Sequence, residues 1–447
     1  MEELGGYSER VASLLRRAGA RVFDRVRVAK RDGRIYEGIL LPRPHYGDPN
    51  CIVLKLDNGY NIGIEADEET RIELVERGEE PALAEVLKPK ISAELPRVFM
   101  VGTGGTIASR IDYKTGAVYA FFTAEEIYSM IPELLEIACV EAETVFSIFS
   151  EDMTQERWSK LSEEVYRRIR EGYDGIVIAH GTDTMGYTAA ALSFALRDLP
   201  CPVVLVGAQR SSDRPSTDTI ENVIAAVSAA AYAPFAEVAV IMHGSTSDDY
   251  CLAHRGTKVR KCHTSRRDAF RSINDRPLAA IRRREIEMLR EDYVRRDPDR
   301  EPKLENGFES RVALVKFYPG MDPAIIEYLW SAGYRGIVLE GTGLGHVRTE
   351  MIPTLARVIR DGVAVVMTSQ CLWGRVNMNV YRTGVELLKA GVIPGEDMLP
   401  ETAFVKLCWV LARASDLEEI RKLMLANISG EINPRTSNES YPPVWKL

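Results

Sequence analysis

The chain has 447 residues, of which 45% are hydrophobic and 27% are charged, with a formal net charge of −8. This composition is ordinary for a soluble globular protein, and the length predicts two or three domains. The negative charge argues against a protein whose whole surface binds a phosphate backbone, although a local basic patch is compatible with it.

The cysteines and the apolar runs indicate a compartment. The seven cysteines are scattered and include no CxxC pair, which favours reduced thiols and a cytoplasmic location over a disulfide framework. The first residues are acidic and lack a secretory signal, and no apolar run reaches membrane-spanning length. We therefore expect no membrane partner.

The first segment predicts a small β-domain, placed at residues 1–80. A helix is expected over residues 8–19, and about five short strands follow at 25–30, 35–41, 51–56, 60–64 and 71–75. The triplet Asp57-Asn58-Gly59 is a strong hairpin signal. Short strands at this spacing favour a small β-barrel, and the charged, proline-containing segment 81–95 is interpreted as a linker.

A buried strand over residues 96–100 leads into Val101-Gly102-Thr103-Gly104-Gly105-Thr106. Glycines leave room for a ligand beside the backbone, and ligands usually bind at the carboxyl ends of strands in α/β sheets. Thr106 is therefore a candidate nucleophile. The alternative is that the glycines only permit a tight turn between strand and helix.

A second buried strand, 175–179, leads into His180-Gly181-Thr182-Asp183-Thr184-Met185. Here a threonine again follows a strand, with a carboxylate beside it. Asp183 is suited to hold a substrate ammonium group, and Thr182 supplies a second hydroxyl to the same site. The alternative is that these residues cap the following helix, and the two roles are compatible.

A threonine hydroxyl is a poor nucleophile unless a neighbouring base takes its proton. The segment Arg255-Gly256-Thr257-Lys258 offers a lysine, and a buried lysine is able to act as a base because burial lowers its pKa. The usual fate of a lysine in a basic segment is the solvated surface, so both places stay open for Lys258. Cys251, His254, Cys262 and His263 lie near it, but their spacing matches no common zinc finger, and no metal is expected.

Beyond the linker, strands and helices alternate through residues 96–300 and 301–447. Such alternation predicts two α/β domains with mostly parallel sheets covered by helices. Helices are expected over 123–136, 154–171, 218–232, 323–332, 351–360 and 402–425, and a strand over 140–149. The charged stretch 282–310 is interpreted as a solvated helix and linker. Residues 207–210 follow a strand at the active edge, where they could line the site or form an ordinary loop. The chain has no GxxxxGK[ST] motif, so it is not expected to bind ATP itself.

The two loop motifs resemble a known family. Thr-Gly-Gly-Thr-Ile-Ala at 103–108 and His-Gly-Thr-Asp-Thr-Met at 180–185 are similar to the two signatures of type-II-like L-asparaginases and related amidohydrolases. The resemblance implies that Thr106 is the acylated nucleophile. It also implies that Thr182 and Lys258 share a proton while Asp183 holds the substrate's α-amino group. Because two threonines are present, single mutants that trap an acyl adduct are needed to decide which one is acylated.

The same resemblance implies substrate-binding residues. Ser150 and Glu151 lie in the segment similar to the one that binds the substrate's α-carboxylate, with Ser150 as the contact. Tyr119 lies where the family's mobile lid carries a catalytic tyrosine. The family chemistry requires no metal.

The stretch 55–64 looks like the N-terminal barrel of archaeal glutamyl-tRNA(Gln) amidotransferase D subunits, so the resemblance covers essentially the whole chain. It implies a glutaminase that hydrolyses L-glutamine and passes ammonia to the amidotransferase E subunit, the transamidase. That partner would use ATP and Mg to convert Glu-tRNA(Gln) to Gln-tRNA(Gln), with tRNA(Gln) bound mainly through it. A homodimer within a heterotetramer is implied, and the barrel would dock the partner.

Three alternatives stay open. The chain could be a free-standing L-asparaginase, or it could be a non-catalytic scaffold that binds an amino acid. The third alternative concerns the N-terminal barrel, which could be a solubility or dimerisation appendage with no role in the reaction.

Overall fold

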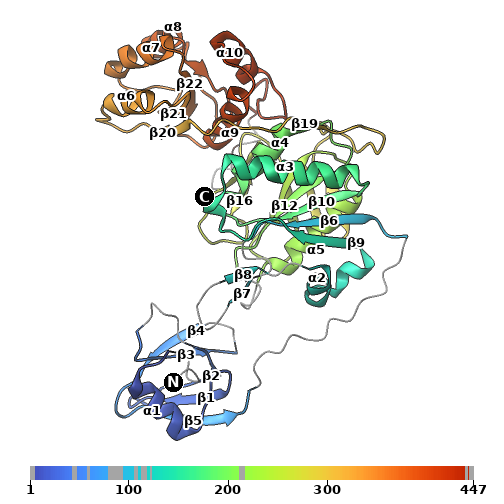
Figure 1. The fold of residues 1–447 in the computed structure, drawn as a ribbon, viewed down its shortest axis with the longest axis vertical. Coiled ribbons are helices and arrows are strands. Elements are labelled where there is room, and N and C mark those ends of the chain that lie inside the picture. The colour runs from blue at the N-terminus through green and yellow to red at the C-terminus, as the bar shows by residue number, and fades with distance from the viewer. Residues whose placement is uncertain are drawn as a thin grey trace, which may run out of the picture.

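The structure is a computed structural model of the chain. It describes residues 6–42, 48–57, 61–78, 94–104, 109–111, 118–120, 123–210, 217–437 and 441, without the side chains of residues 61, 109–111 and 118–120. Three bodies follow one another along the long axis, with the N-terminal domain at one end (Figure 1).

The N-terminal domain is a five-stranded antiparallel sheet with one helix packed on it. Its elements are α1 (Glu9–Ala18), β1 (Arg25–Ala29), β2 (Ile35–Leu40), β3 (Cys51–Lys55), β4 (Asn61–Glu65) and β5 (Arg71–Glu76), in the sheet order β4-β3-β2-β1-β5. Alternate residues such as Val26, Val28 and Leu54 turn into a core shared with Val11 and Leu15 of α1. The predicted helix, the strands and the pairing of β3 with β4 are confirmed, and β4 and β5 form the two edges of this strand order. The hairpin residues Asn58 and Gly59 lie outside the described part.

The second domain is built on an eight-stranded sheet in the order β18-β17-β14-β13-β12-β10-β6-β9. Its strands are β6 (Arg97–Gly102), β9 (Cys139–Thr144), β10 (Gly175–Ala179), β12 (Val203–Val206), β13 (Val238–His243), β14 (Cys251–Arg255), β17 (Ala279–Arg282) and β18 (Glu285–Met288). Five neighbouring strands pair in parallel, in the order β9-β6-β10-β12-β13. Strands β14, β17 and β18 extend the sheet beyond β13 with antiparallel pairing. Buried strands with apolar residues on both faces are typical of such a sheet.

Helices cover both faces of this sheet, as the alternation predicts. The helices are α2 (Ala124–Met130), α3 (Gln155–Arg170), α4 (Met185–Ala195) and α5 (Thr219–Tyr232). Within β6, Val98 and Met100 belong to the core under α2 and α5, whereas Phe99 and Val101 belong to the core under α3 and α4. Small two-stranded pairs complete the domain: β7 (Ser109–Ile111) with β8 (Val118–Ala120), β11 (Leu196–Arg197) with β19 (Lys303–Leu304), and β15 (Val259–Lys261) with β16 (Phe270–Ser272).

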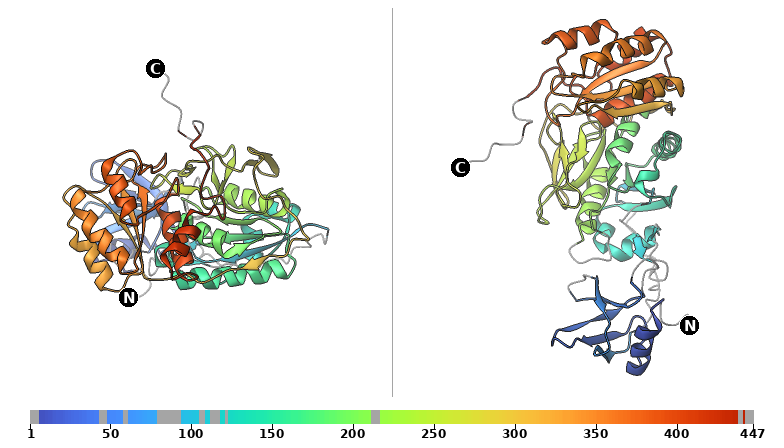
Figure 2. Two further views of the ribbon diagram at one scale, coloured as in Figure 1. Left: turned by 90° about the horizontal axis from the view of Figure 1, so that it is seen from above. Right: turned by 90° about the vertical axis from the view of Figure 1, so that its left-hand side faces the viewer.

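The C-terminal domain has a four-stranded parallel sheet in the order β20-β21-β22-β23. Its elements are β20 (Val312–Lys316), α6 (Ala324–Ser331), β21 (Gly336–Gly341), α7 (Ile352–Arg360), β22 (Ala364–Ser369), α8 (Arg382–Lys389), β23 (Ile393–Pro394), α9 (Pro400–Leu411) and α10 (Leu417–Leu425). Figure 2 shows α6, α7 and α8 on the outer side of this sheet. Helices α9 and α10 pack on the other face.

Helix α4 lies between the two α/β domains. It is apolar on all sides, as expected for a helix buried on every face. Met185 and Leu192 pack under the large sheet, and Ala191 and Phe194 pack in the core of the C-terminal domain. The loop that precedes α4 is therefore anchored by both domains.

Three sequence expectations are wrong in detail. The stretch 282–310 contains no described helix, because β17 and β18 form a hairpin in which Ile286 and Met288 pack on the sheet. The strand expected over 140–149 ends at Thr144. The helical region 402–425 is divided into α9 and α10, and the Asp416 carboxylate caps α10 by accepting from two backbone N–H groups.

None of the described helices has both the length and the apolar character needed to span a bilayer.

Candidate active site

The loops after β6 and β10 lie at one edge of the large sheet. The two strands are parallel neighbours with Gly102 opposite Ala179, so their carboxyl ends meet. Thr103 joins them, because its backbone N–H and its Oγ1 hydroxyl both donate to the Ala179 carbonyl, at 3.0 and 2.9 Å. The two signatures are therefore adjacent in space.

Gly104 begins the first loop in a backbone conformation that only glycine adopts readily, with φ of 105°. A Cβ at this position would lie 2.1 Å from the Ile148 carbonyl oxygen, so the glycine also permits a close approach of two backbones. Thr106, the predicted nucleophile, lies outside the described residues. Tyr119 is on β8, where its backbone pairs with Arg110 of β7, and its side chain is not among those described.

The second loop presents Thr182 and Asp183 to a lysine. The ammonium of Lys261, at the end of β15, donates to Thr182 Oγ1 at 2.9 Å and to Asp183 Oδ1 at 2.9 Å. The Lys261 side chain is 13% exposed, whereas that of Asp183 is 70% exposed. A hydroxyl, an amine and an accessible carboxylate thus converge at the sheet edge.

Lys258 is not the lysine at this site, which corrects the sequence-based expectation. Its side chain is completely buried, and its Nζ lies 2.7 Å from Asp397 Oδ2 of the C-terminal domain. Burial lowers the pKa of the Lys258 ammonium, and the Asp397 carboxylate opposes that shift. Among the described residues its ammonium donates only to Asp397, so Lys258 is engaged away from Thr182 and does not share a proton with it.

The sequence contains a weak signal that distinguishes the two lysines. Residues 256–258 form the turn between β14 and β15, and Lys261 ends the strand that follows. A strand starting after the Gly256-Thr257 pair would carry the second lysine away from the turn. The local pattern shows neither the length of this strand nor that Asp397 pairs with Lys258, so the sequence did not identify Lys261.

The other predicted substrate-binding residues come from the 3₁₀ turn Ser150–Asp152. Ser150 is buried against the second loop, since a Cβ on Gly181 would lie 2.8 Å from the Ser150 Cβ and 3.1 Å from its Oγ. The Thr184 hydroxyl donates to the Ser150 carbonyl at 2.6 Å. The structure therefore brings Ser150 together with Thr182, Asp183 and Lys261, while Glu151 is exposed beside it.

The loop after β12 forms a further wall. Gly207 packs directly on the site, because a Cβ there would lie 2.7 Å from Thr182 Cγ2. The buried Asp218 carboxylate holds the loop by accepting from the backbone N–H groups of Gln209 and Arg210, each at 2.9 Å. Through Gly207, this loop thus contacts Thr182 of the site.

The four residues considered for zinc are not gathered around an ion. His254 Nδ1 is 2.9 Å from the Ser272 hydroxyl, and His263 Nδ1 accepts from two backbone N–H groups of its own loop. Cys251 lies against Asn222, and Cys262 is exposed. Within the part of the chain that the structure describes, no three His, Cys, Asp or Glu side chains are grouped as metal ligands.

His180 supports the second loop from below. Its Nδ1 is 2.7 Å from the Gly181 carbonyl and donates to it, so Nε2 accepts from the Thr188 hydroxyl at 2.9 Å. The Trp158 indole N–H donates to the same hydroxyl oxygen at 3.2 Å. This chain of hydrogen bonds requires a neutral imidazole, and burial lowers the pKa of His180 to about 4.

The buried His180 predicts a loss of stability in mild acid. In the unfolded chain an imidazole binds a proton below its ordinary pKa of 6.5, but in the folded chain only below about 4. Stability is therefore fully kept above pH 6.5 and falls by up to about 3 kcal/mol as the pH drops toward 4. Denaturant unfolding at several pH values should show a flatter dependence in His180→Gln than in the wild type. Identical slopes for the two proteins would contradict the assignment.

Comparison with known proteins gives matches along nearly the whole chain. Family models match at residues 20–75 (GatD N-terminal domain), 97–293 (Asparaginase, N-terminal) and 311–424 (Glutaminase/Asparaginase C-terminal domain). The glutamyl-tRNA(Gln) amidotransferase D subunit of Thermofilum pendens is 53% identical over 446 residues, covering 98% of each chain. The corresponding D subunit of Pyrococcus abyssi is 55% identical over 444 residues, covering 97% of this chain and 99% of the relative.

Solved structures of L-asparaginases match about three quarters of the chain. The thermostable L-asparaginase from Thermococcus kodakarensis superposes with a TM-score of 0.70 at 33% identity, covering 76% of this chain and 100% of that one. L-asparaginase I from Vibrio cholerae gives a TM-score of 0.67 at 30% identity, covering 76% and 99%. The predicted asparaginase-like fold is confirmed.

Proposed function

The chain belongs to the family of glutamyl-tRNA(Gln) amidotransferase D subunits, and on that premise we propose that it is the glutaminase of such an amidotransferase. It hydrolyses L-glutamine and supplies the ammonia that converts Glu-tRNA(Gln) to Gln-tRNA(Gln) on a partner protein. The observation that carries the chemistry is the Lys261 ammonium, which lies 2.9 Å from both Thr182 Oγ1 and Asp183 Oδ1. A lysine beside a hydroxyl forms a unit that is able to move a proton.

In the proposed reaction, Thr106 Oγ attacks the side-chain amide carbon of glutamine. The C–N bond breaks, the nitrogen takes up a proton and leaves as ammonia, and water then cleaves the acyl ester to release glutamate. Thr182 and Lys261 share the proton that this reaction moves, and Tyr119 is proposed as the catalytic tyrosine that the family resemblance implies. Backbone N–H groups of the two threonine loops stabilise the oxyanion.

Substrate is held by its α-substituents. Asp183 is suited to the α-ammonium group because its carboxylate is largely exposed and already binds one ammonium, that of Lys261. Ser150, with Glu151 next to it, lies against Gly181 and is proposed to contact the α-carboxylate. These contacts orient the side-chain amide toward the reacting groups.

The partner chemistry is proposed from the family. The partner, the E subunit of the amidotransferase, would bind tRNA(Gln) and use ATP with Mg, while this chain needs no cofactor. The active assembly would be a cytoplasmic heterotetramer built on a homodimer of this chain. A match at residues 20–75 to the GatD N-terminal domain supports an amidotransferase component over a free-standing L-asparaginase, because the two solved asparaginases named above cover only 76% of this chain.

The amidotransferase and asparaginase functions differ in their response to partner and tRNA. We expect ammonia release from L-glutamine to exceed that from L-asparagine and to rise when partner and Glu-tRNA(Gln) are added. The measurement is ammonia release from each amino acid, with and without the partner and tRNA. Turnover of asparagine that is faster and independent of the partner would favour the free-standing enzyme. Absence of ammonia under every condition would favour a scaffold.

A further inference from the structure

The buried ion pair of Lys258 with Asp397 crosses from the second domain to the C-terminal domain. Both side chains are almost fully buried, at 0% and 2% exposure. Two charges removed from water contribute little net stability, because desolvation offsets their attraction, but they require one geometry. The pair therefore restricts where the turn at residues 256–258 lies against the C-terminal domain.

Asp397 is also held from a second direction. Its Oδ1 accepts from the Asn433 backbone N–H at 2.9 Å, and its Oδ2 accepts from the Asn433 side-chain amide at 2.8 Å. The same amide donates to the carbonyl of Asn274 at 2.7 Å, and the Asn274 amide donates to the Asp397 carbonyl at 3.1 Å. Since Asn274 follows β16 and Lys258 precedes β15, both ends of the β15–β16 hairpin are tied to Asp397.

Residues 426–434, which we call the C-terminal strap, return from α10 to the second domain. Glu431 anchors the strap through a completely buried ion pair with Lys406 of α9, at 2.6 Å. The strap carbonyl of Ser429 then accepts from the Thr257 hydroxyl at 3.0 Å, while the Thr257 carbonyl accepts from Thr402 of α9 at 2.8 Å. The turn before β15 is thus gripped by both the strap and α9.

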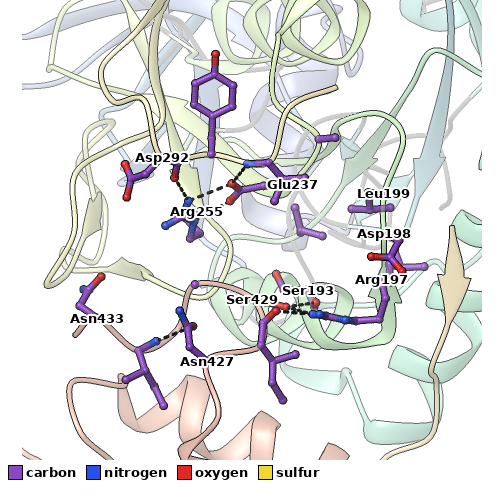
Figure 3. Close-up of a pocket in the computed structure, with 18 of the residues that line it drawn as sticks. Ser193, Arg197, Asp198, Leu199, Glu237, Arg255, Asp292, Asn427, Ser429 and Asn433 are labelled. Atoms are coloured by element: carbon purple, nitrogen blue, oxygen red, sulfur yellow. Dashed lines mark hydrogen bonds and ion pairs between the residues drawn. The ribbon is translucent and has the colours of Figure 1, made fainter. Parts of the chain in front are cut away.

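The strap lines a cavity of about 430 Å³. Figure 3 shows Asn427, Ser429 and Asn433 of the strap opposite Arg255 and Glu237. Gly430 of the strap is packed closely on Arg255, the residue before the turn, because a Cβ there would lie 2.7 Å from the Arg255 Cδ. Arg255 is held in turn by Glu237, with its Nε 2.7 Å from Oε2. The segment leading into β15 therefore has little freedom on any side.

This rigidity fixes the position of Lys261. It lies three positions after Lys258, at the far end of β15, and its long side chain must reach Thr182 and Asp183. A displacement of about 1 Å in a reacting group costs roughly 100-fold in rate.

From these contacts we propose that Lys258 is a positioning residue for Lys261: with Asp397 and the C-terminal strap, it sets the β15–β16 hairpin against the Thr182 loop. The C-terminal domain thereby determines the geometry of a site whose reacting groups come from the second domain. This inference rests on the proposed glutaminase function.

The first test compares Lys258→Met with the wild-type full chain in its complex. We expect kcat for glutamine to fall about 10- to 100-fold while KM changes less than about threefold, because Ser150 and Asp183 keep their places. The matched control is Leu355→Ala, a truncation in the outer core of the C-terminal domain, which lowers stability but should leave kcat within about twofold. A normal kcat in Lys258→Met, or an equal loss in the control, would overturn the proposal.

The second test separates positioning from a general structural role. If Lys258 acts through Lys261, adding Lys258→Met to Lys261→Met should leave the residual rate unchanged within about twofold. A further loss of about tenfold or more would mean that Lys258 acts independently, which contradicts the proposal.

If Lys258→Met fails to fold, Asn433→Ala loosens the same network without leaving a buried charge unpaired. We then expect a smaller fall in kcat, about fivefold, again absent in the Lys261→Met background. Failure of the proposed function would be recognised separately, because the wild type itself would release no ammonia from glutamine.

Discussion

Replacing Lys261 with methionine should lower kcat for glutamine hydrolysis by about 1,000-fold, within the range found for removal of a proton-transfer group. The thioether side chain keeps the length of the lysine but neither donates to Thr182 nor accepts a proton from it. Lys261→Arg should not restore activity, because a guanidinium keeps its proton at every accessible pH. Steady-state ammonia release gives the measurement.

The control for this substitution is Lys160→Met on α3, whose ammonium is exposed and pairs with Glu156 one helical turn away. Loss of such a surface pair has little energetic effect, so this variant should keep wild-type activity. If Lys261→Met retained activity within about threefold of the wild type, Lys261 would not belong to the catalytic set.

Replacing Thr106 with alanine should reduce kcat by at least about 1,000-fold, because the acyl-enzyme can no longer form at the proposed nucleophile. Thr106→Ser keeps the hydroxyl and should lose far less. The alanine variant should still bind glutamine, because the proposed contacts to the α-substituents come from Asp183 and Ser150. Binding measured by calorimetry, together with single-turnover kinetics, separates these effects.

The choice between the two threonines is decided by where the acyl group accumulates. In the Lys261→Met background, slow deacylation should leave a glutamyl ester on the peptide that contains Thr106 and none on the one that contains Thr182. Peptide mass spectrometry after rapid acid quenching detects the adduct. An ester on Thr182, or near-normal hydrolysis by Thr106→Ala, would reverse the assignment.

The local sequence pattern was sufficient to predict elements that depend on neighbouring residues alone. The apolar strands before Gly102 and His180 were predicted correctly, because burial on both faces of a parallel sheet leaves a continuous apolar run. The meeting of their two loops follows from β6 and β10 being parallel neighbours. The hairpin at 279–288 was missed because its charged residues conceal the alternation of Ile281, Ile286 and Met288.

The sequence by itself determined the α/β class, the N-terminal β-domain, the two threonine loops and the family. Which lysine serves the site was decided only by the tertiary structure. The sequence distinguishes Lys258 from Lys261 only weakly, and the choice between them depends on Asp397, a carboxylate far away in the sequence that folding brings to 2.7 Å from Lys258. Which carboxylate pairs with a buried lysine depends on how distant segments pack, and the residues next to the lysine in the sequence do not indicate that packing.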